Sequence, residues 1–196
     1  MIKAIIFDLN GIFIQSPKLS DRFEKDFGIS SEIFLPKLSE IMNKVRQPNT
    51  GKSFNYWEPV LKEWNIKLSE QEFWKYWFEV EEPSERMISF AKKLKERGIK
   101  IFVLSNNFKE RAEYYGHYPW MHEVVDKAYF SCQTGFVKPN TEAWKLVLKE
   151  NNLEPEECLY FDDQEKNIKA SEEVGIKAFM FINEVGLEKT VNGYIK

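Results

Sequence analysis

Hydrophobic residues along the chain are grouped into five short runs separated by longer amphipathic stretches. The runs are rich in Ile, Val, Phe and Tyr and do not alternate strictly with polar residues, which is typical of strands buried on both faces of a sheet. We therefore predict strands at residues 3–7, 100–104, 127–130, 158–161 and 177–182.

Apolar residues at helical spacing mark the stretches between these runs. Ser84 can cap a helix in which Met87, Phe90 and Leu94 share one face, and Gly98 ends it. Similar patterns predict helices at residues 108–115, 141–149 and 164–174. Alternating strands and helices imply a parallel sheet with right-handed crossovers and helices on both faces. The predicted fold class is α/β, with a doubly wound, Rossmann-like core.

The interval from residue 14 to residue 82 interrupts this alternation, because it contains no convincing strand pattern. We predict an all-helical insertion there, with Pro36 in the first turn of one helix and a loop at residues 47–51. The predicted domains are an α/β core of residues 1–14 and 84–196 and a helical insertion of residues 15–83. Four of the six Trp residues fall in the insertion: Trp57, Trp64, Trp74 and Trp77. Their helical spacing favours a packed core over an aromatic ligand site.

Composition adds limits on partners and location. Hydrophobic residues make up 43% of the chain and charged residues 30%, which is ordinary for a globular protein. The 28 basic and 31 acidic side chains leave a net charge of -3, so we expect no nucleic-acid or membrane partner. No apolar stretch reaches membrane-spanning length, and we expect a cytoplasmic protein that is a monomer or a homodimer.

The cysteines and histidines do not form a recognisable site. Cys132 and Cys158 are far apart and are not at metal-ligand spacing, so we expect two reduced, buried thiols. His117 and His122 adjoin no carboxylate motif, and we expect them on the surface or at helix ends.

Candidate chemistry is concentrated where the predicted strands end. Asp8, Ser105 and Asp162 each lie one residue beyond a strand, and ligands of open parallel sheets bind beyond the carboxyl ends of the strands. A Gly-marked loop delivers Lys138 toward the next helix, and Asp163 follows Asp162. Three carboxylates crowded into one crevice would repel one another, so the cluster predicts a bound cation, for which Mg²⁺ with its preference for hard oxygen ligands is suited.

Four motifs occur in order along the chain: D-x-N-G at Asp8, L-S-N-N at Ser105, G-x-x-K-P at Lys138 and F-D-D-x-x-x-N at Asp162. In this combination the chain resembles the haloacid dehalogenase-like hydrolase superfamily, of the capped subfamily I type with a helical cap. The resemblance covers the core, at about residues 1–14 and 84–183, and implies that the helical insertion is the cap.

The resemblance implies a role for each motif residue. Asp8 would be the nucleophile that forms an aspartyl intermediate, and Ser105 would hydrogen-bond the transferring group, with Asn106 beside it as a further substrate-binding candidate. Lys138 would hold the nucleophile and neutralise phosphate charge. The metal ligands would be Asp8, Asp162, Asp163 and the backbone carbonyl of Asn10. Asn167 could hydrogen-bond across the Asp162–Asp163 turn or could merely cap its helix.

Asn10 departs from the pattern of the phosphatases in that superfamily, which usually carry Asp there as general acid and base. An amide donates hydrogen bonds but does not exchange protons at neutral pH. We therefore expect a Mg²⁺-dependent phosphatase for a small phosphorylated metabolite with weakened acid catalysis at Asn10. Two alternatives stay open: a catalytically weak phosphate-binding or protein-interaction module on the same fold, and a haloacid dehalogenase.

Overall fold

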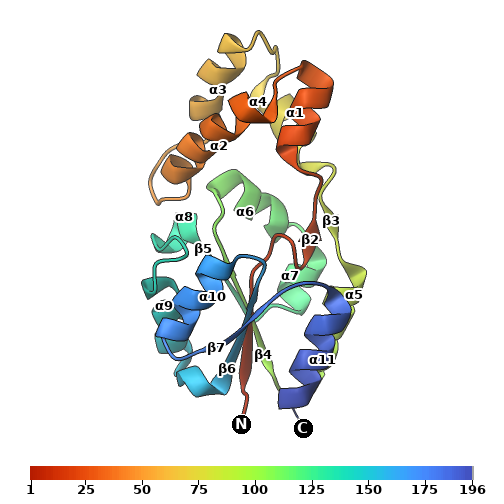
Figure 1. Cartoon of the computed structure of the whole chain (residues 1–196), viewed down its shortest axis with the longest axis vertical. Helices are drawn as coiled ribbons and strands as arrows, with labels where there is room; N and C mark the ends of the chain where they lie inside the picture. Colours follow the sequence, from red (N-terminus) through yellow and green to blue (C-terminus); the bar gives the residue numbers. More distant parts are fainter. Residues whose placement is uncertain (196) are drawn as a thin grey trace.

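A computed structural model of the chain describes residues 1–195 and contains a parallel sheet of five strands in the order β5-β4-β1-β6-β7 (Figure 1). Every neighbouring pair in this sheet is parallel. The strands are β1 (Ala4–Phe7), β4 (Lys100–Ser105), β5 (Lys127–Phe130), β6 (Cys158–Asp162) and β7 (Lys177–Met180). All five predicted strands are confirmed, and the fold class is the predicted doubly wound α/β architecture.

Helices cover both faces of the sheet because consecutive residues of each strand point to opposite sides. Ile5 and Phe7 of β1 belong to the apolar cluster beneath α5 (Glu85–Glu96) and α11 (Glu184–Tyr194). Ala4 and Ile6 belong to the cluster beneath α9 (Glu142–Asn151) and α10 (Glu165–Glu173). Both faces are therefore dry, which explains the unbroken apolar runs. The core helices are α5 (Glu85–Glu96), α6 (Lys109–Gly116), α7 (Pro119–Glu123), α8 (Ser131–Thr134), α9 (Glu142–Asn151), α10 (Glu165–Glu173) and α11 (Glu184–Tyr194).

The helical insertion has an apolar core of its own. It consists of α1 (Leu19–Phe27), α2 (Ser31–Val45), α3 (Phe54–Glu63) and α4 (Glu70–Phe78). Trp57 and Trp77 are buried in this core, and Trp64 and Trp74 pack against it. The predicted packing role of these tryptophans is confirmed. Figure 1 shows the insertion beyond the carboxyl ends of the sheet strands, opposite the two chain termini.

Two short strands join the insertion to the core. β2 (Ile14–Gln15) and β3 (Glu82–Pro83) pair antiparallel where the chain leaves and re-enters the core. The expectation of no strand between residues 14 and 82 is therefore wrong at its two ends. A strand of two residues is too short to produce a periodic pattern, so only the pairing of distant segments reveals it.

Pro36 does not lie in the first turn of a helix, as the sequence pattern predicted. Helix α2 begins one turn earlier, at Ser31, and Pro36 lies inside it. Proline inside a helix leaves one carbonyl of the preceding turn without its amide partner. Pro36 is exposed, and so is Glu32, which carries that carbonyl, so water can reach it.

Three further expectations concern membrane-spanning helices, the cysteines and the histidines. No helix within residues 1–195 is long and apolar enough to cross a membrane. Cys132 and Cys158 are free thiols, but only Cys158 is fully buried, so the expectation of burial is wrong for Cys132. His117 and His122 are exposed and each pairs with a nearby backbone carbonyl, as expected of surface histidines.

Candidate active site

The carboxyl ends of three adjacent strands bring Asp8, Ser105 and Asp162 to one place. β1 is the central strand, with β4 on one side and β6 on the other, so the three residues lie at the same edge. The backbone N–H of Asp8 donates to the Phe161 carbonyl at 2.9 Å, which continues the β1–β6 pairing up to the carboxylate. All three side chains are buried, with at most 6% of each residue exposed.

A cavity of about 300 Å³ opens over this edge. Most of the residues predicted from sequence line it: Asp8, Asn10, Ser105, Asn106, Lys138 and Asp163. Asp162 lies directly behind them, bonded to Lys138. The structure thus brings together all the residues that the motifs nominated.

Lys138 bridges two of the carboxylates. Its Nζ lies 3.0 Å from Asp8 Oδ1 and 2.7 Å from Asp162 Oδ2. Asn106 fixes the lysine loop, because its side-chain oxygen accepts from the Lys138 N–H and its amide donates to the Lys138 carbonyl, both at 2.8 Å. The Asn106 amide is therefore engaged with the backbone of that loop.

Asp162 is held by a second group of donors. Asn167 Nδ2 donates to both of its oxygens at 3.0 Å, and the Gln164 N–H donates to Oδ1 at 2.8 Å. The Tyr160 hydroxyl donates to Oδ2. Gln164, and not Asn167, is the N-cap of α10. Of the two interpretations of Asn167, the bond to the acidic pair is confirmed and the capping role is wrong.

Electrostatics in the cavity depend on the crowding of negative charge. Burial raises the pKa of Asp8, although Lys138 partly offsets it. Burial also opposes ionisation of Asp162, but the charge and hydrogen bond of Lys138 outweigh it and lower the pKa of that carboxyl. Burial and the charges of Asp8 and Asp162 raise the pKa of Asp163 to about 6.

One oxygen from each of Asp8, Asp162 and Asp163 lies within 4.8 Å of the others. That spacing allows a single divalent cation to contact all three, and such a cation would remove the repulsion that raises two of their pKa values. The donor set is carboxylate oxygen throughout, which fits Mg²⁺ or Ca²⁺ and not a metal that prefers nitrogen or sulfur.

The sequence model of haloacid dehalogenase-like hydrolases matches residues 2–175. The chain belongs to this family. It is 26% identical to the glyceraldehyde 3-phosphate phosphatase of Methanocaldococcus jannaschii over 90% of its own length and 83% of that protein. It is also 30% identical, over 98 residues, to the sesquiterpene phosphatase astK of Aspergillus oryzae. The aligned part is 48% of each chain, so this hydrolase spans about half the length of that curated relative.

Solved structures share the fold of this hydrolase. A haloacid dehalogenase family enzyme of Bacteroides thetaiotaomicron, crystallised with magnesium and inorganic phosphate, matches it with a TM-score of 0.77 at 19% identity. The match covers 92% of this chain and 94% of that one. The likeness extends through the sheet and the helical insertion, and it shows the fold alone.

Position 10 of this hydrolase lies within a chain of hydrogen bonds. Asn10 Oδ1 accepts from Asn107 Nδ2 at 3.0 Å, and Asn10 Nδ2 donates to the Tyr115 hydroxyl at 2.6 Å. Tyr115 in turn donates to Glu81 Oε2 at 2.8 Å, and Asn107 also donates to Ser105 Oγ at 2.9 Å. Both ends of the Asn10 amide are therefore bonded and its orientation is fixed.

Glu81, Tyr115 and Arg111 were not nominated from the sequence. Glu81 precedes β3, while Tyr115 and Arg111 lie on α6, and the Glu81 carboxylate is buried against the Arg111 guanidinium. Glu81 is 30 or more positions away from Arg111 and Tyr115, so no pattern of neighbouring residues in the sequence connects them. Asn107 carried a weak signal, since it is the second Asn of the L-S-N-N motif.

Besides Glu81, the insertion contacts the core through Ser53 and Pro48, and through the rings of its α4, which pack on Phe108. The Ser53 N–H and Oγ donate to the two oxygens of Glu110 at 2.8 and 2.6 Å, so a core carboxylate binds the residue at the N-cap position of α3. Pro48 packs on Gly135, where an added Cβ would lie 3.5 Å from Pro48 Cγ. Arg46 at the end of α2 also lines the active-site cavity.

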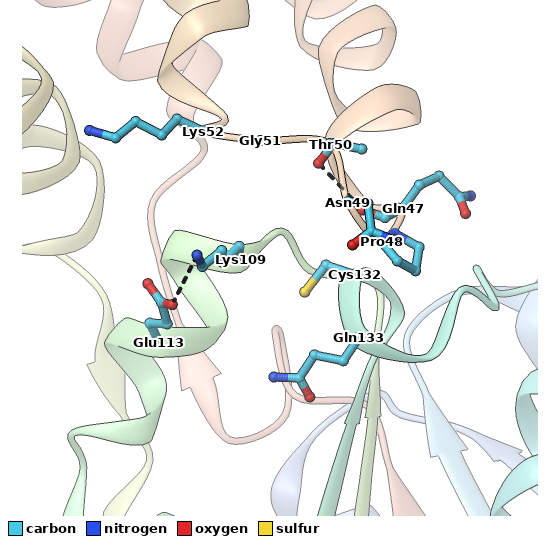
Figure 2. Close-up of a pocket in the computed structure, with 10 residues that line it drawn as sticks. All are labelled: Gln47, Pro48, Asn49, Thr50, Gly51, Lys52, Lys109, Glu113, Cys132 and Gln133. Atoms are coloured by element: carbon cyan, nitrogen blue, oxygen red, sulfur yellow. Dashed lines mark hydrogen bonds and ion pairs between the residues drawn. The ribbon is translucent and has the colours of Figure 1, made fainter.

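A second, larger cavity of about 730 Å³ is lined by Pro48 and its neighbours in the loop between α2 and α3 (Figure 2). Figure 2 shows the loop of residues 47–52 facing Lys109 and Glu113 of α6 and Cys132 of α8. Residues 47–51 form the predicted loop. The two cavities share no lining residue, and the lining of the second contains none of the motif residues.

Proposed function

We propose that this protein is a Mg²⁺-dependent phosphatase that hydrolyses a small phosphorylated metabolite through a phosphoaspartate at Asp8. The observation that carries the proposal is the single Lys138 ammonium bridging Asp8 and Asp162, with Asp163 completing a cluster of carboxylates within 4.8 Å. This combination of a buried carboxylate, an ammonium and a cation-binding cluster is suited to an anionic phosphoryl group. The phosphatase relatives support the same class of substrate.

The two oxygens of Asp8 would have different roles. The Leu9 N–H, at 2.8 Å, and Lys138 both reach Oδ1. Oδ2 would then be the oxygen that attacks phosphorus, forming an O–P bond as the bond to the leaving oxygen breaks. Ser105 Oγ, oriented by Asn107, would hydrogen-bond the transferring phosphoryl group. Water would next attack phosphorus as the O–P bond to Asp8 breaks, which gives the Asp8 carboxylate and inorganic phosphate that keeps the protons of the water.

Mg²⁺ would be held by Asp8, Asp162, Asp163 and the backbone carbonyl of Asn10, and it would neutralise phosphoryl charge. Lys138 supplies a second positive charge to the same group. Asn106 would act by fixing the Lys138 loop, because its side chain is bonded to that backbone. The predicted substrate contact of Asn106 would then be indirect.

Asn10 makes the proposed reaction depend on the leaving group. A placed acid contributes about 10²–10⁴ to the rate of such a step, and an amide cannot supply it. Alkoxide leaving groups need a proton, whereas acetate and nitrophenolate leave without one. The substrate would therefore be an acyl phosphate or another ester with a good leaving group, or an alkyl ester that is hydrolysed slowly.

Residues 15–83 would act as the cap of the enzyme. The Ser53–Glu110 contact and the Pro48–Gly135 contact would hold it over the cavity. Release of these contacts would admit substrate, and their formation would exclude water from the reacting centre.

The test compares p-nitrophenyl phosphate and acetyl phosphate as substrates of the unaltered protein, Asp8→Asn and Asn10→Asp. We expect Mg²⁺-dependent phosphate release that chelation by EDTA abolishes and loss of release in Asp8→Asn. Release should be faster in Asn10→Asp, because a carboxylate at position 10 can activate the water that hydrolyses phosphoryl-Asp8. Absence of Mg²⁺-dependent release from both the unaltered protein and Asn10→Asp would overturn the proposal.

Asn10 also favours a second candidate, a phosphate-binding module without useful turnover. That protein would bind inorganic phosphate in a Mg²⁺-dependent way, and Asn10→Asp would not create turnover. A haloacid dehalogenase would instead release halide from a 2-haloacid without Mg²⁺. The Asp8–Asp162–Asp163 cluster disfavours that reaction, because it concentrates negative charge that a metal-free reaction would leave uncompensated.

A further inference from the structure

Arg46 is a cation in the active-site cavity that no ion pair accounts for. It lies at the C-cap of α2, and its side chain lines the same 300 Å³ cavity as Asp8 and Lys138. Within residues 1–195 it forms no salt bridge, and its buried Nε has no hydrogen-bond acceptor. A buried donor without an acceptor is costly, so this geometry favours a ligand that supplies one.

Three other cations in the described part of the chain line the cavity: Lys138, Arg111 and Lys166. Lys166 is exposed on α10, where water solvates its charge, and the other two are paired within the protein. Lys138 is shared by Asp8 and Asp162, and Arg111 is paired with the buried Glu81 carboxylate. Their charges are balanced by the protein itself. Arg46 is therefore the partly buried cation of the cavity whose charge and Nε donor a bound molecule would have to balance.

We propose that Arg46, with Arg111 beside it, forms a subsite for a second anionic group of the substrate, separate from the phosphoryl group that reacts at Asp8. The inference rests on the proposed phosphatase function and narrows its substrate class. The substrate is then a small phosphate compound that carries, besides the reacting phosphoryl group, a carboxylate or a second phosphate.

Two observations separate this subsite from the phosphoryl site. The reacting phosphoryl group would have core partners of its own in Ser105, Lys138 and a cation held by the carboxylates, whereas Arg46 belongs to the insertion. Burial lowers the pKa of Arg46, the charge of Arg111 lowers it further, and Asp8 has a smaller opposite effect. Arg46 is thus influenced more by Arg111 than by the nucleophile, and an anion between the two guanidinium groups would relieve their repulsion.

The position of Arg46 also links the subsite to closure. Pro48, two residues later, rests on Gly135 of the core, and Ser53 is bonded to Glu110. These contacts hold the end of α2 over the sheet edge, so an anion bound at Arg46 would be enclosed between insertion and core. The cavity volume of about 300 Å³ is suited to a small substrate.

Three phosphonates test the subsite by binding, because a P–C bond is not hydrolysed. Propylphosphonate has only the phosphoryl-like group, 3-phosphonopropionate adds a carboxylate, and propane-1,3-bisphosphonate adds a second phosphonate. Calorimetric titration with saturating Mg²⁺ at neutral pH gives the dissociation constant of each. The second anionic group would form a charge-assisted contact. We therefore expect one or both of the ligands that carry it to bind about 10- to 100-fold more tightly than propylphosphonate.

The variant Arg46→Gln separates the two sites. We expect it to reduce the advantage of the second anion to within about threefold and to leave the affinity for propylphosphonate unchanged. Arg46→Lys, which keeps the charge, should keep part of the advantage. Lys44→Gln removes a charge from the exposed face of the same helix, where Lys44 pairs with Glu40, and should change none of the three affinities. Thermal unfolding checks that each variant is folded.

The outcomes are distinct. If Arg46→Gln weakens all three ligands equally, Arg46 contacts the reacting phosphoryl group and the second-anion subsite is wrong. If propylphosphonate binds but the second anion brings no advantage in the unaltered protein, the subsite is likewise wrong and the phosphatase proposal stands. If propylphosphonate itself does not bind with Mg²⁺, the phosphoryl site fails and the subsite falls with it. The ligand with the larger Arg46-dependent advantage identifies carboxylate or phosphate as the second anion.

Discussion

The side-chain amide of Asn10 donates a 2.6 Å hydrogen bond to the hydroxyl of Tyr115. The Tyr115 hydroxyl in turn donates a hydrogen bond to the Glu81 carboxylate. Glu81 lies just before β3, the strand that leads from the helical insertion back to the core. Burial raises the pKa of Tyr115 well above its ordinary value, so the phenol stays protonated in this chain. Position 10 is therefore fixed by groups that also hold the insertion, but it carries no transferable proton.

Replacing Asn10 by Asp should restore acid catalysis. The introduced carboxylate and Glu81 would compete for the Tyr115 hydroxyl proton, which would favour the protonated form of the new carboxyl. We expect the rate of phosphoryl transfer to Asp8 from an alkyl phosphate to rise by about 10²–10⁴, and the rate from acetyl phosphate to change much less. Rapid-quench measurement of single turnovers gives both rates. An equal change for both donors would show that position 10 does not act through the leaving group.

Gly11 should be required for cation binding. It has φ +88°, and an added Cβ would lie 3.0 Å from Asp163 Oδ2. We expect Gly11→Ala to displace Asp163 and to weaken Mg²⁺ binding about tenfold or more, measured by calorimetry. Gly98→Ala is the matched control, because Gly98 has φ +81° with no atom within 4 Å of the added Cβ. It should lose about 1 kcal/mol of unfolding free energy and bind Mg²⁺ normally. Equal Mg²⁺ affinity in both variants would refute the contact.

Mg²⁺ affinity should depend on pH through Asp163. The pKa of this carboxyl in the metal-free protein is raised to about 6 by burial and by Asp8 and Asp162. Protons compete with Mg²⁺ for the carboxylate below that value and not above it. We expect the Mg²⁺ affinity to be constant above about pH 7 and to decrease by nearly tenfold per pH unit below about pH 6. Mg²⁺ titrations at a series of pH values that covers both regions measure this affinity. An affinity that is flat down to pH 5 would contradict this ionisation.

Glu110 should stabilise the contact between insertion and core. Its carboxylate accepts both the N–H and the hydroxyl of Ser53 at the start of α3. Glu110→Gln keeps one acceptor and loses the charge, so we expect a loss of about 1–2 kcal/mol in unfolding free energy by urea titration. Glu113→Gln, one turn later, loses only a long 3.8 Å exposed pair with Lys109 and should change stability by less than about 0.5 kcal/mol. Similar losses in the two variants would show that the Ser53 contact contributes nothing specific.

The strands and the motif residues could be predicted because their signals are local. Asp8, Ser105 and Asp162 stand at the ends of apolar runs, and parallel strands bring such ends together whatever their order. The hydrogen-bond partners of the Asn167 and Asn106 side chains could not be predicted, because the sequence left two roles open for each amide. Only the loop geometry decides between them.

Residues from distant segments could not be found in the same way. Arg46 follows an ordinary amphipathic helix, and Glu81 precedes a strand of two residues that pairs with Ile14 and Gln15. Neither has a neighbour in sequence that indicates a site. Their roles depend on the way the insertion folds back over the sheet, which is a property of tertiary packing.

The most direct test of the proposed mechanism is to trap phosphoryl-Asp8. Asn10 cannot activate water, so the intermediate formed from acetyl phosphate and Mg²⁺ should accumulate. Intact and peptide mass spectrometry after a rapid quench should show one phosphoryl group on the peptide that contains Asp8, lost on removal of Mg²⁺ and absent from Asp8→Asn. Turnover of acetyl phosphate that continues in Asp8→Asn, with no phosphoryl group on the Asp8 peptide of the unaltered protein, would contradict the mechanism.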